Sequence, residues 1–247
     1  MDMSTNAVLR SEWIKIRSVR SVTYSLMAVF AVTLAVTVLA TAIVGQAEAG
    51  NADYEPLFSA FYALNFGQIA AISFGATAIS SEFVNGALRI SLTAVPRRGL
   101  LYAAKVSVIG ALALAVGLIT SFATFLVGQM FMGEYAIGLG DTGVLRAAVG
   151  GGVYLALIAL FAAGLTTFLR SAVAVLSTLI PFLLIVSFVV GDVAGDVAQY
   201  LPDQAGQLVL HQNPDGDLGP WTGLTVTAAW AALALVAGWW SLRTRDA

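Results

Sequence analysis

Residue types that carry out covalent or metal chemistry are scarce in this sequence. The chain of 247 residues contains no cysteine and a single histidine, His211. Thiol catalysis, disulfides and a histidine-based metal cluster within one chain are therefore excluded. No G-x-x-x-x-G-K-[ST] phosphate loop is present, and the glycine cluster at residues 150–152 lacks the lysine of such a loop. We expect no catalytic residue, metal site or cofactor on this chain, so it is not itself an enzyme.

The densest group of charged side chains occupies the segment 80–105. It contains one carboxylate, Glu82, and the basic residues Arg89, Arg97, Arg98 and Lys105. Acidic residues contribute little to membrane orientation, so a lone carboxylate has no use in a connector that only sets topology. We predict that Glu82 makes a charge-assisted contact with a basic groove of a partner protein. Such a contact contributes about 1.5–3 kcal/mol.

A short helix is expected in the middle of the same segment. The Asn-Gly pair at residues 85–86 should end the preceding helix, and Pro96 should end the next one, so residues 87–94 form a helix of their own. Leu88 and Leu92 fall on one face of it, which suits docking into a partner's groove. The alternative is a charged connector that only orients the chain.

Long apolar stretches must position this segment. Apolar residues make up 59% of the chain and charged residues 11%, whereas a soluble domain has about 25% charged residues. A helix needs roughly 20 apolar residues to cross about 30 Å of hydrocarbon. Six stretches qualify, at residues 22–45, 58–79, 106–131, 147–169, 172–190 and 221–242. The sequence thus predicts an all-α integral membrane protein, with a single six-span domain over residues 22–247.

Basic residues are distributed unevenly between the segments that connect these spans. With the N-terminus in the cytoplasm, eleven of the twelve lysines and arginines lie in inner segments, and Arg146 lies outside. Ten of the 14 acidic residues lie outside. Lysine and arginine in short loops are retained on the cytoplasmic side. We therefore predict a multi-pass protein with both termini in the cytoplasm.

Residues 1–21 are expected to form an amphipathic helix that lies in the membrane interface. Leu9, Trp13 and Ile16 recur at i, i+4 and i+7, and the basic residues of this stretch point elsewhere. This arrangement places an apolar face in the bilayer and basic residues near anionic lipid. The alternative is a basic flank that only sets topology.

Polar and small residues share one face of the second span. Asn65 and Gln68 are followed at helical spacing by the small residues 71, 75 and 78. Polar side chains at membrane depth face protein or a cavity, because lipid cannot satisfy them. We therefore predict that Asn65 and Gln68 line a substrate route. The alternative is that they lie in the contact between two packed helices. In the fourth span, small residues at four-residue steps indicate packing.

The spans carry no charged residue or histidine away from their ends. Ion-coupled carriers generally keep ionisable groups inside the bundle, so energy for transport would come from another protein. The outer segment 191–220 is acidic, and the spacing of its apolar residues predicts a short helix at the outer leaflet. The segment could form a lid on the exit or, at residues 215–217, a cation site, but a polar turn is the favoured alternative, with His211 at the surface.

The segment after the second span resembles the first cytoplasmic loop of bacterial ABC type-2 transporter permeases. The shared pattern is E-[FY]-x-x-G-[TA]-[LI]-R, followed by a proline, paired arginines and a lysine at the start of the next span. It is carried here by Glu82, Phe83, Gly86, Ala87, Leu88, Arg89, Pro96, Arg97, Arg98 and Lys105. Residues 11–15 and 200–206 also resemble the family. The chain has ten arginines and two lysines. Such an excess of arginine over lysine is often seen in proteins from GC-rich genomes and is consistent with an actinobacterial source.

The resemblance implies a permease subunit that exports a hydrophobic or amphipathic substrate, such as a drug, peptide or lipid, across the bacterial cytoplasmic membrane. It implies pairing with a second permease copy or close relative, and docking of two ATP-binding cassette subunits that hold ATP and Mg²⁺. The residues that would couple to them are Glu82, Phe83, Gly86, Leu88, Arg89 and Leu92. Nucleic acid is not an expected partner. A passive channel or scramblase, a carrier of neutral solutes, and a membrane scaffold stay open as alternatives.

Overall fold

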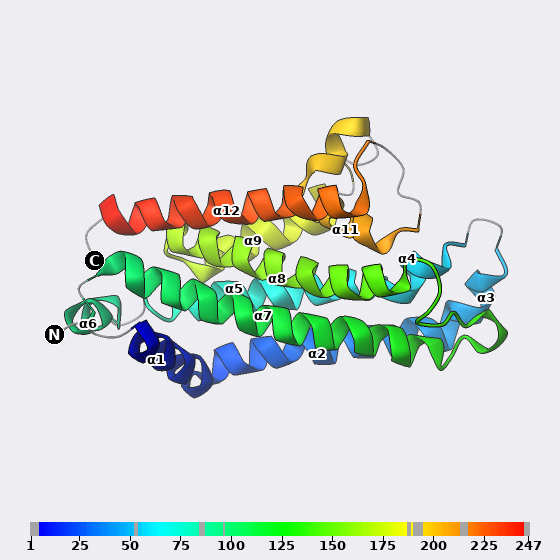
Figure 1. The fold of residues 1–247 in the computed structure, drawn as a ribbon, viewed down its shortest axis with the longest axis horizontal. Helices are drawn as coiled ribbons and strands as arrows, with labels where there is room; N and C mark the ends of the chain where they lie inside the picture. Colours follow the sequence, from blue (N-terminus) through cyan, green and yellow to red (C-terminus); the bar gives the residue numbers. More distant parts are fainter. Residues whose placement is uncertain are drawn as a thin grey trace.

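The chain folds into an elongated bundle of helices that run along a common axis (Figure 1). The computed structural model describes residues 5–51, 54–83, 87–95, 97–186, 189, 195–212 and 217–244. Within these ranges every element is a helix and no residue forms a strand. The predicted all-α membrane class is confirmed.

Five segments are long and apolar enough to cross a membrane. They are Arg20–Ala49, Pro56–Ser80, Arg98–Gln129, Val144–Leu169 and Pro220–Thr244. These segments match five of the six predicted spans. The remaining prediction, residues 172–190, corresponds to a shorter apolar helix, Ala172–Ile185. Residues 187–188 and 190 of that predicted span lie outside the described residues.

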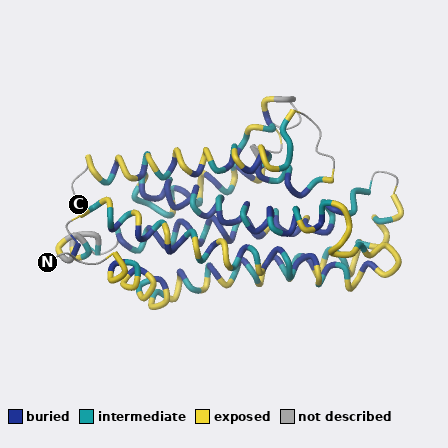
Figure 2. The backbone as a smooth tube through the Cα atoms, in the orientation of Figure 1, coloured by how far each residue is buried: buried dark blue, intermediate teal, exposed yellow. Residues whose placement is uncertain are grey.

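The centre of the bundle is α8 (Val144–Leu169). Three long helices pack against it, namely α5 (Leu64–Ser80), α7 (Arg98–Gln129) and α12 (Pro220–Thr244). Of the five long apolar segments, α8 has the largest buried share, and the dark stretch along it is visible in Figure 2. Its apolar residues therefore meet protein on most sides, whereas the outer faces of its neighbours are exposed.

Glycines let the neighbours of α8 approach its backbone. A Cβ on Gly75 of α5 would lie 2.0 Å from the carbonyl oxygen of Ala159, and one on Gly152 of α8 would lie 2.7 Å from the Cα of Leu118. Any side chain at these positions would collide with backbone atoms, so the close helix contacts depend on glycine. The packing role predicted for the small residues of the fourth span therefore holds at Gly152.

The N-terminal part supplies one outer layer of the bundle. It consists of α1 (Thr5–Ser18), α2 (Arg20–Ala40), the π turn η1 (Thr41–Gly45), α3 (Gln46–Ala49) and α4 (Pro56–Phe61), which leads into α5. The backbone of Val19 is extended, which separates α1 from α2 and lets the two helices take different directions. Helix α2 packs against α5 and α7, and α1 packs against α7.

A tight connection joins α8 to α9 (Ala172–Pro181). Arg170 adopts a left-handed conformation with φ of 56°, and the hydroxyl of Ser171 accepts a hydrogen bond from the Ala174 backbone at 3.2 Å. Pro181 cannot donate a backbone hydrogen bond, and the helix widens directly after it into a π turn, η3 (Phe182–Val186).

The described part of the segment 191–220 folds back onto the bundle. It forms η4 (Gly195–Tyr200), α11 (Pro202–Gln207) and η5 (Leu208–Leu210). Helix α11 contacts both α8 and α12, and the Thr227 hydroxyl donates to the Pro202 carbonyl oxygen at 2.9 Å. Most of α11 and η5 is buried. Residues 202–210 are therefore packed against the bundle. Residues 213–216, which include part of the predicted polar turn, lie outside the described residues, and the role of a gate stays a prediction.

The two ends of the bundle carry different elements. The start of α1, the short helix α6 (Ala87–Ala94) and the last turn of α12 lie at one end, and α3 and α4 lie at the other (Figure 1). The structure thus brings the first and last described helices and the predicted docking helix to the same end. That this end faces the cytoplasm stays a prediction.

Candidate functional site

Four charged side chains converge at the end of the bundle that carries α6. Glu12 and Lys15 come from α1, Lys105 comes from α7, and Glu82 lies in the turn after α5. Lys15 Nζ lies 2.7 Å from Glu12 Oε1 and 3.2 Å from Glu82 Oε1. Lys105 Nζ lies 2.7 Å from Glu12 Oε2 and 2.9 Å from Glu82 Oε1. Each lysine bridges both carboxylates, and we call these four residues the charged cluster.

Most of the charged cluster is removed from solvent. Glu12 is fully buried, and Lys105 and Glu82 are 5% and 6% exposed. Burial of an ion costs several kcal/mol, which an opposite charge at close range offsets. Two carboxylates and two ammonium groups balance here, so the loss of any one member would leave an uncompensated buried charge. The cluster thereby fixes α1 against α5 and α7.

The cluster also holds α6. The hydroxyl of Ser91, on α6, donates a hydrogen bond to Glu82 Oε2 at 2.9 Å and accepts one from Lys15 Nζ at 3.0 Å. Directly after α6, Val95 is buried with Val8 and Leu101 in a small apolar cluster. One side of the 87–95 segment is therefore attached to the rest of the chain.

Of the described side chains of α6, two that lie away from Ser91 are exposed, and we call them the open side of α6. Ile90 is 71% exposed, and Thr93 is also exposed and hydrogen-bonds to the Ile90 carbonyl oxygen within its own helix. An exposed isoleucine on a short helix at the end of the bundle is the kind of apolar side chain that docks into a partner's groove.

The surroundings shift the pKa values of two cluster members in opposite directions. Burial acts to raise the pKa of Glu82, but the charge and hydrogen bond of Lys105 and the charge of Lys15 outweigh it, so the pKa lies below 4.5. Burial acts to lower the pKa of Lys15, but the hydrogen bond with Glu12 and the charge of Glu82 outweigh it, so the pKa lies above 10.5. Both shifts favour the ionised form.

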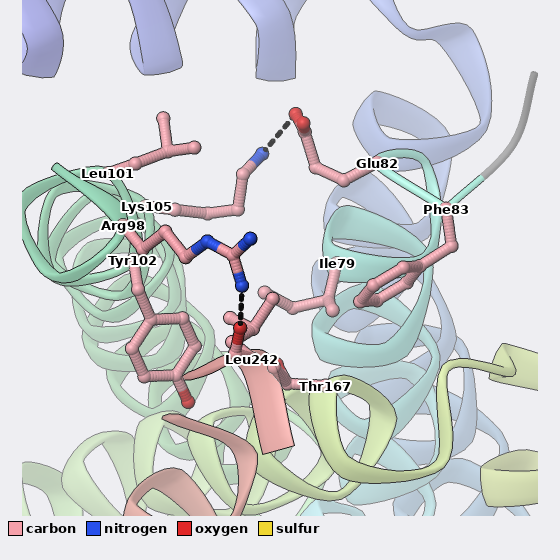
Figure 3. A pocket seen from close by; sticks show the side chains of 9 residues that line it. All are labelled: Ile79, Glu82, Phe83, Arg98, Leu101, Tyr102, Lys105, Thr167 and Leu242. Carbon is pink, nitrogen blue, oxygen red and sulfur yellow. Dashed lines mark hydrogen bonds and ion pairs between the residues drawn. The ribbon is translucent and has the colours of Figure 1, made fainter. Parts of the chain in front are cut away.

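A small pocket lies beside the charged cluster (Figure 3). Lys105 and Glu82 point toward each other at its edge, and Arg98 Nη1 donates to the Leu242 carbonyl oxygen at 2.8 Å, which ties the start of α7 to the end of α12. The pocket holds about 30 Å³, whereas sites for small molecules hold roughly 300–1,000 Å³. This region is therefore a contact between helices, and the pocket is too small for a typical small-molecule ligand.

The predicted coupling residues have different surroundings. Glu82 is paired within its own chain, so its carboxylate is not free for the direct contact with a partner that we predicted. Phe83 is half-buried, and the Arg170 guanidinium lies 5.8 Å from its ring centre. Gly86 lies outside the described residues. The side chains of Leu88, Arg89 and Leu92 lie outside them too, although their backbone belongs to α6.

The N-terminal helix turns one face toward the protein, and its position in the membrane interface stays a prediction. Ile16 is buried and Leu9 is half-buried against the core, but Trp13 is 40% exposed. The face turned toward the protein carries Val8, Glu12 and Ile16. The sequence analysis did not single out Glu12 as a site residue. Its i, i+4 spacing from two aliphatic residues was the available signal.

Gln68 and Asn65 take part in contacts within the chain. Gln68 is buried, and its amide oxygen accepts a hydrogen bond from the Tyr154 hydroxyl, to which the Gln207 amide also donates at 3.3 Å. Asn65 is half-buried and donates to the Tyr62 carbonyl oxygen at 3.1 Å. These contacts are those of the packing alternative. A role in a substrate route stays a prediction.

Comparison with known proteins identifies the family. A family model described as "ABC-2 family transporter protein" matches residues 8–193, which is more than half of the chain and includes the charged cluster and α6. No curated protein matches the chain. The match agrees with the resemblance of the 80–105 segment, and it does not bear on the source organism. The chain therefore belongs to the ABC-2 family of transporter proteins.

Proposed function

We propose that the chain is the permease subunit of an ATP-driven exporter, and that separate subunits that bind and hydrolyse ATP dock at the end of the bundle that carries α6. The observation that carries this proposal is that the Ser91 hydroxyl accepts a hydrogen bond from Lys15 and donates one to Glu82, both members of the charged cluster. If a partner displaced α6, these hydrogen bonds would pull on the ion pairs of the charged cluster. Helices α1 and α7 and the turn after α5 would then move as well, because they supply the members of that cluster.

The structure supports a division of roles within the 80–105 segment. Ile90 lies on the open side of α6 and is available to a partner, whereas Ser91 and Glu82 face inward. Glu82 is then a positioning residue, which holds α6 in place and does not contact the ATP-binding subunit. Phe83, Arg89 and the other predicted coupling residues remain part of this proposal.

The assembly that we propose contains a second permease copy or close relative and two ATP-binding subunits, which hold ATP and Mg²⁺. The proposed cargo is hydrophobic or amphipathic. Eleven of the twelve basic residues lie in the segments that would face the cytoplasm, and this asymmetry supports a cytoplasmic position for both termini and for α6.

Docking is tested by purification of the permease from its native membrane in a mild detergent. Ile90→Ala should lower the amount of co-purified ATP-binding subunit by about tenfold, because the apolar contact is lost. The matched control is Val197→Ala at the other end of the bundle, where the side chain is 72% exposed. Equal recovery of the ATP-binding subunit with both variants would contradict docking at α6.

Coupling is tested on the same complex with two hydroxyl variants of α6. Ser91→Ala should keep the ATP-binding subunit bound but remove most of the change in its ATPase rate that the permease causes. Thr93→Ala is the control, because that hydroxyl donates to the Ile90 carbonyl oxygen of α6 and makes no hydrogen bond with the charged cluster among the residues that the structure describes. If no ATP-binding protein co-purifies with the wild-type chain, a channel or a scaffold becomes the better description.

A further inference from the structure

A larger cavity lies at the end of the bundle opposite to the charged cluster. Its volume is about 350 Å³, which falls within the range of roughly 300–1,000 Å³ that is usual for small-molecule sites. The walls come from the π turn η1 and α3, from α4 with its flanking residues, and from the end of α7. Helices α3 and α4 both lie toward this end in Figure 1.

Aromatic rings form one wall of the cavity. Tyr54, Phe58 and Tyr62 line it, and the rings of Phe58 and Tyr62 meet edge to face with centroids 6.1 Å apart and planes at 77°. Tyr62 remains 46% exposed. The face of an aromatic ring carries partial negative charge, so a cation placed over it is attracted by the ring quadrupole.

The charge on the described residues that line the cavity is negative. Glu48 is the only ionised side chain among the described residues that line it, and no lysine or arginine does so. Burial and the charge of Glu48 together raise the pKa of Tyr54, against the effect of a hydrogen bond with Ser59. The field of the carboxylate therefore reaches the aromatic wall, and an anion would meet repulsion there.

Hydrogen bonds hold the walls of this cavity in place. The Gln46 side chain donates to the Phe131 carbonyl oxygen at 2.8 Å, which ties α3 to the end of α7. Gln129, a lining residue, accepts a hydrogen bond from the Ile137 backbone at 2.8 Å. The lining helix widens into a π turn at Thr41–Gly45, and single π turns inside helices are frequent at functional sites.

We propose that this cavity binds lipophilic organic cations, in which one positive charge is carried by an apolar body, and that such cations are the cargo class of this permease. Aromatic faces and a single carboxylate, with no opposing positive charge among the described lining residues, select that chemistry over anions and zwitterions. The proposed binding of cations depends only on the cavity, whereas the proposal that these cations are transported depends on the proposed function.

The test uses two probes of nearly equal size and opposite charge. The full-length permease, in nanodiscs of neutral lipid and without any ATP-binding subunit, is titrated with tetraphenylphosphonium and with tetraphenylborate, and binding to empty nanodiscs is subtracted. The cation should bind with a Kd at least tenfold lower than that of the anion. Glu48→Gln should raise the Kd for the cation about tenfold, and Tyr62→Leu should raise it about threefold.

The control variant is Glu134→Gln, which removes an exposed carboxylate that does not line the cavity. It should leave the Kd for the cation unchanged. Equal binding of both probes, or equal effects of Glu48→Gln and Glu134→Gln, would overturn the cation site. Normal cation binding by a permease that recruits no ATP-binding subunit would instead overturn the proposed export function and leave the site intact.

Discussion

The two ends of the bundle are stabilised by different kinds of interaction. At the end that carries α6, the buried side chains of Glu12, Glu82 and Lys105 form ion pairs that bridge α1, α7 and the turn after α5, and the partly exposed Lys15 joins them. At the other end, His211 Nδ1 lies 2.8 Å from Glu55 Oε2, and both side chains are about one-third exposed. The first end is held by ion pairs that are mostly buried, and the second has a partly exposed hydrogen-bonded pair and a cavity of about 350 Å³.

The difference indicates where rigidity is needed. A buried ion-pair network tolerates few arrangements, because a displaced member loses its compensation. Such a network suits the transmission of movement between helices. An exposed pair is screened by water and is easily broken and remade. In our proposal, the end that receives a partner is therefore the stiff one, and the end that holds a ligand can adjust.

The largest effect is expected for the removal of one buried cation. Lys105→Met leaves Glu12 and Glu82 with a single lysine between them, and loss of one partner from a buried pair costs about 3–5 kcal/mol. Thermal unfolding of the purified subunit in detergent checks this value. The double variant Lys105→Met/Glu12→Gln should recover much of the loss. A single variant as stable as the wild type would show that the cluster is not a stabilising joint.

The next effect is a loss of stability in acid. The pKa of Glu82 lies below 4.5 in the folded chain, so its contribution is present above that value and is lost as the pH falls through the folded pKa. The contribution of Lys15, with its pKa above 10.5, is kept at neutral pH and lost only in strong base. Melting temperatures between pH 7 and pH 3.5 check this prediction. Glu82→Gln should lose less stability on acidification than the wild type does.

A smaller effect is expected for the neutral hydrogen bonds inside the bundle. Gln68→Leu removes the acceptor of the Tyr154 hydroxyl, which keeps its contact with Gln207. The cost should be about 1–3 kcal/mol, the usual range for a buried polar group that loses its partner. Unfolding measurements give this cost, and cation binding by the folded variant should be unchanged. Loss of cation binding without loss of stability would instead favour the substrate route.

The smallest effect is expected at the exposed pair. Glu55 also accepts a hydrogen bond from the Gln212 backbone at 2.6 Å, and His211 stacks on Phe58 with ring centres 4.3 Å apart. Glu55→Gln should cost about 0.5–1 kcal/mol, because water screens the charge. Added salt should reduce even this difference, whereas it should change the effect of Lys105→Met little. If Glu55→Gln lowered the free energy of unfolding as much as Lys105→Met does, the proposed contrast between the two ends would be wrong.

Much of the architecture was predictable because it follows from local composition. Five of the predicted spans correspond to long apolar helices, and α6 has the predicted bounds, Ala87–Ala94. The helix before it ends at Ser80, earlier than the Asn-Gly pair at residues 85–86 that was expected to end it. The surroundings of single side chains were less predictable. Glu82 was expected to reach a partner and instead pairs with two lysines that are distant from it in the sequence. His211 was expected at the surface, where its side chain is 31% exposed, but its stacking on the Phe58 ring was not foreseen.

The sequence by itself determined the membrane class, the positions of most spans, the likeness of the 80–105 segment to a known transporter family and the absence of cysteine chemistry, since each of these depends on residue types within one stretch of chain. Only the tertiary structure decided that Glu12 is buried, that Ser91 connects α6 to the charged cluster and that Glu48 shares a cavity with three aromatic rings. These facts depend on which helices are neighbours. No local pattern of residues encodes that choice, because contacts between distant segments arise only when the apolar faces pack together.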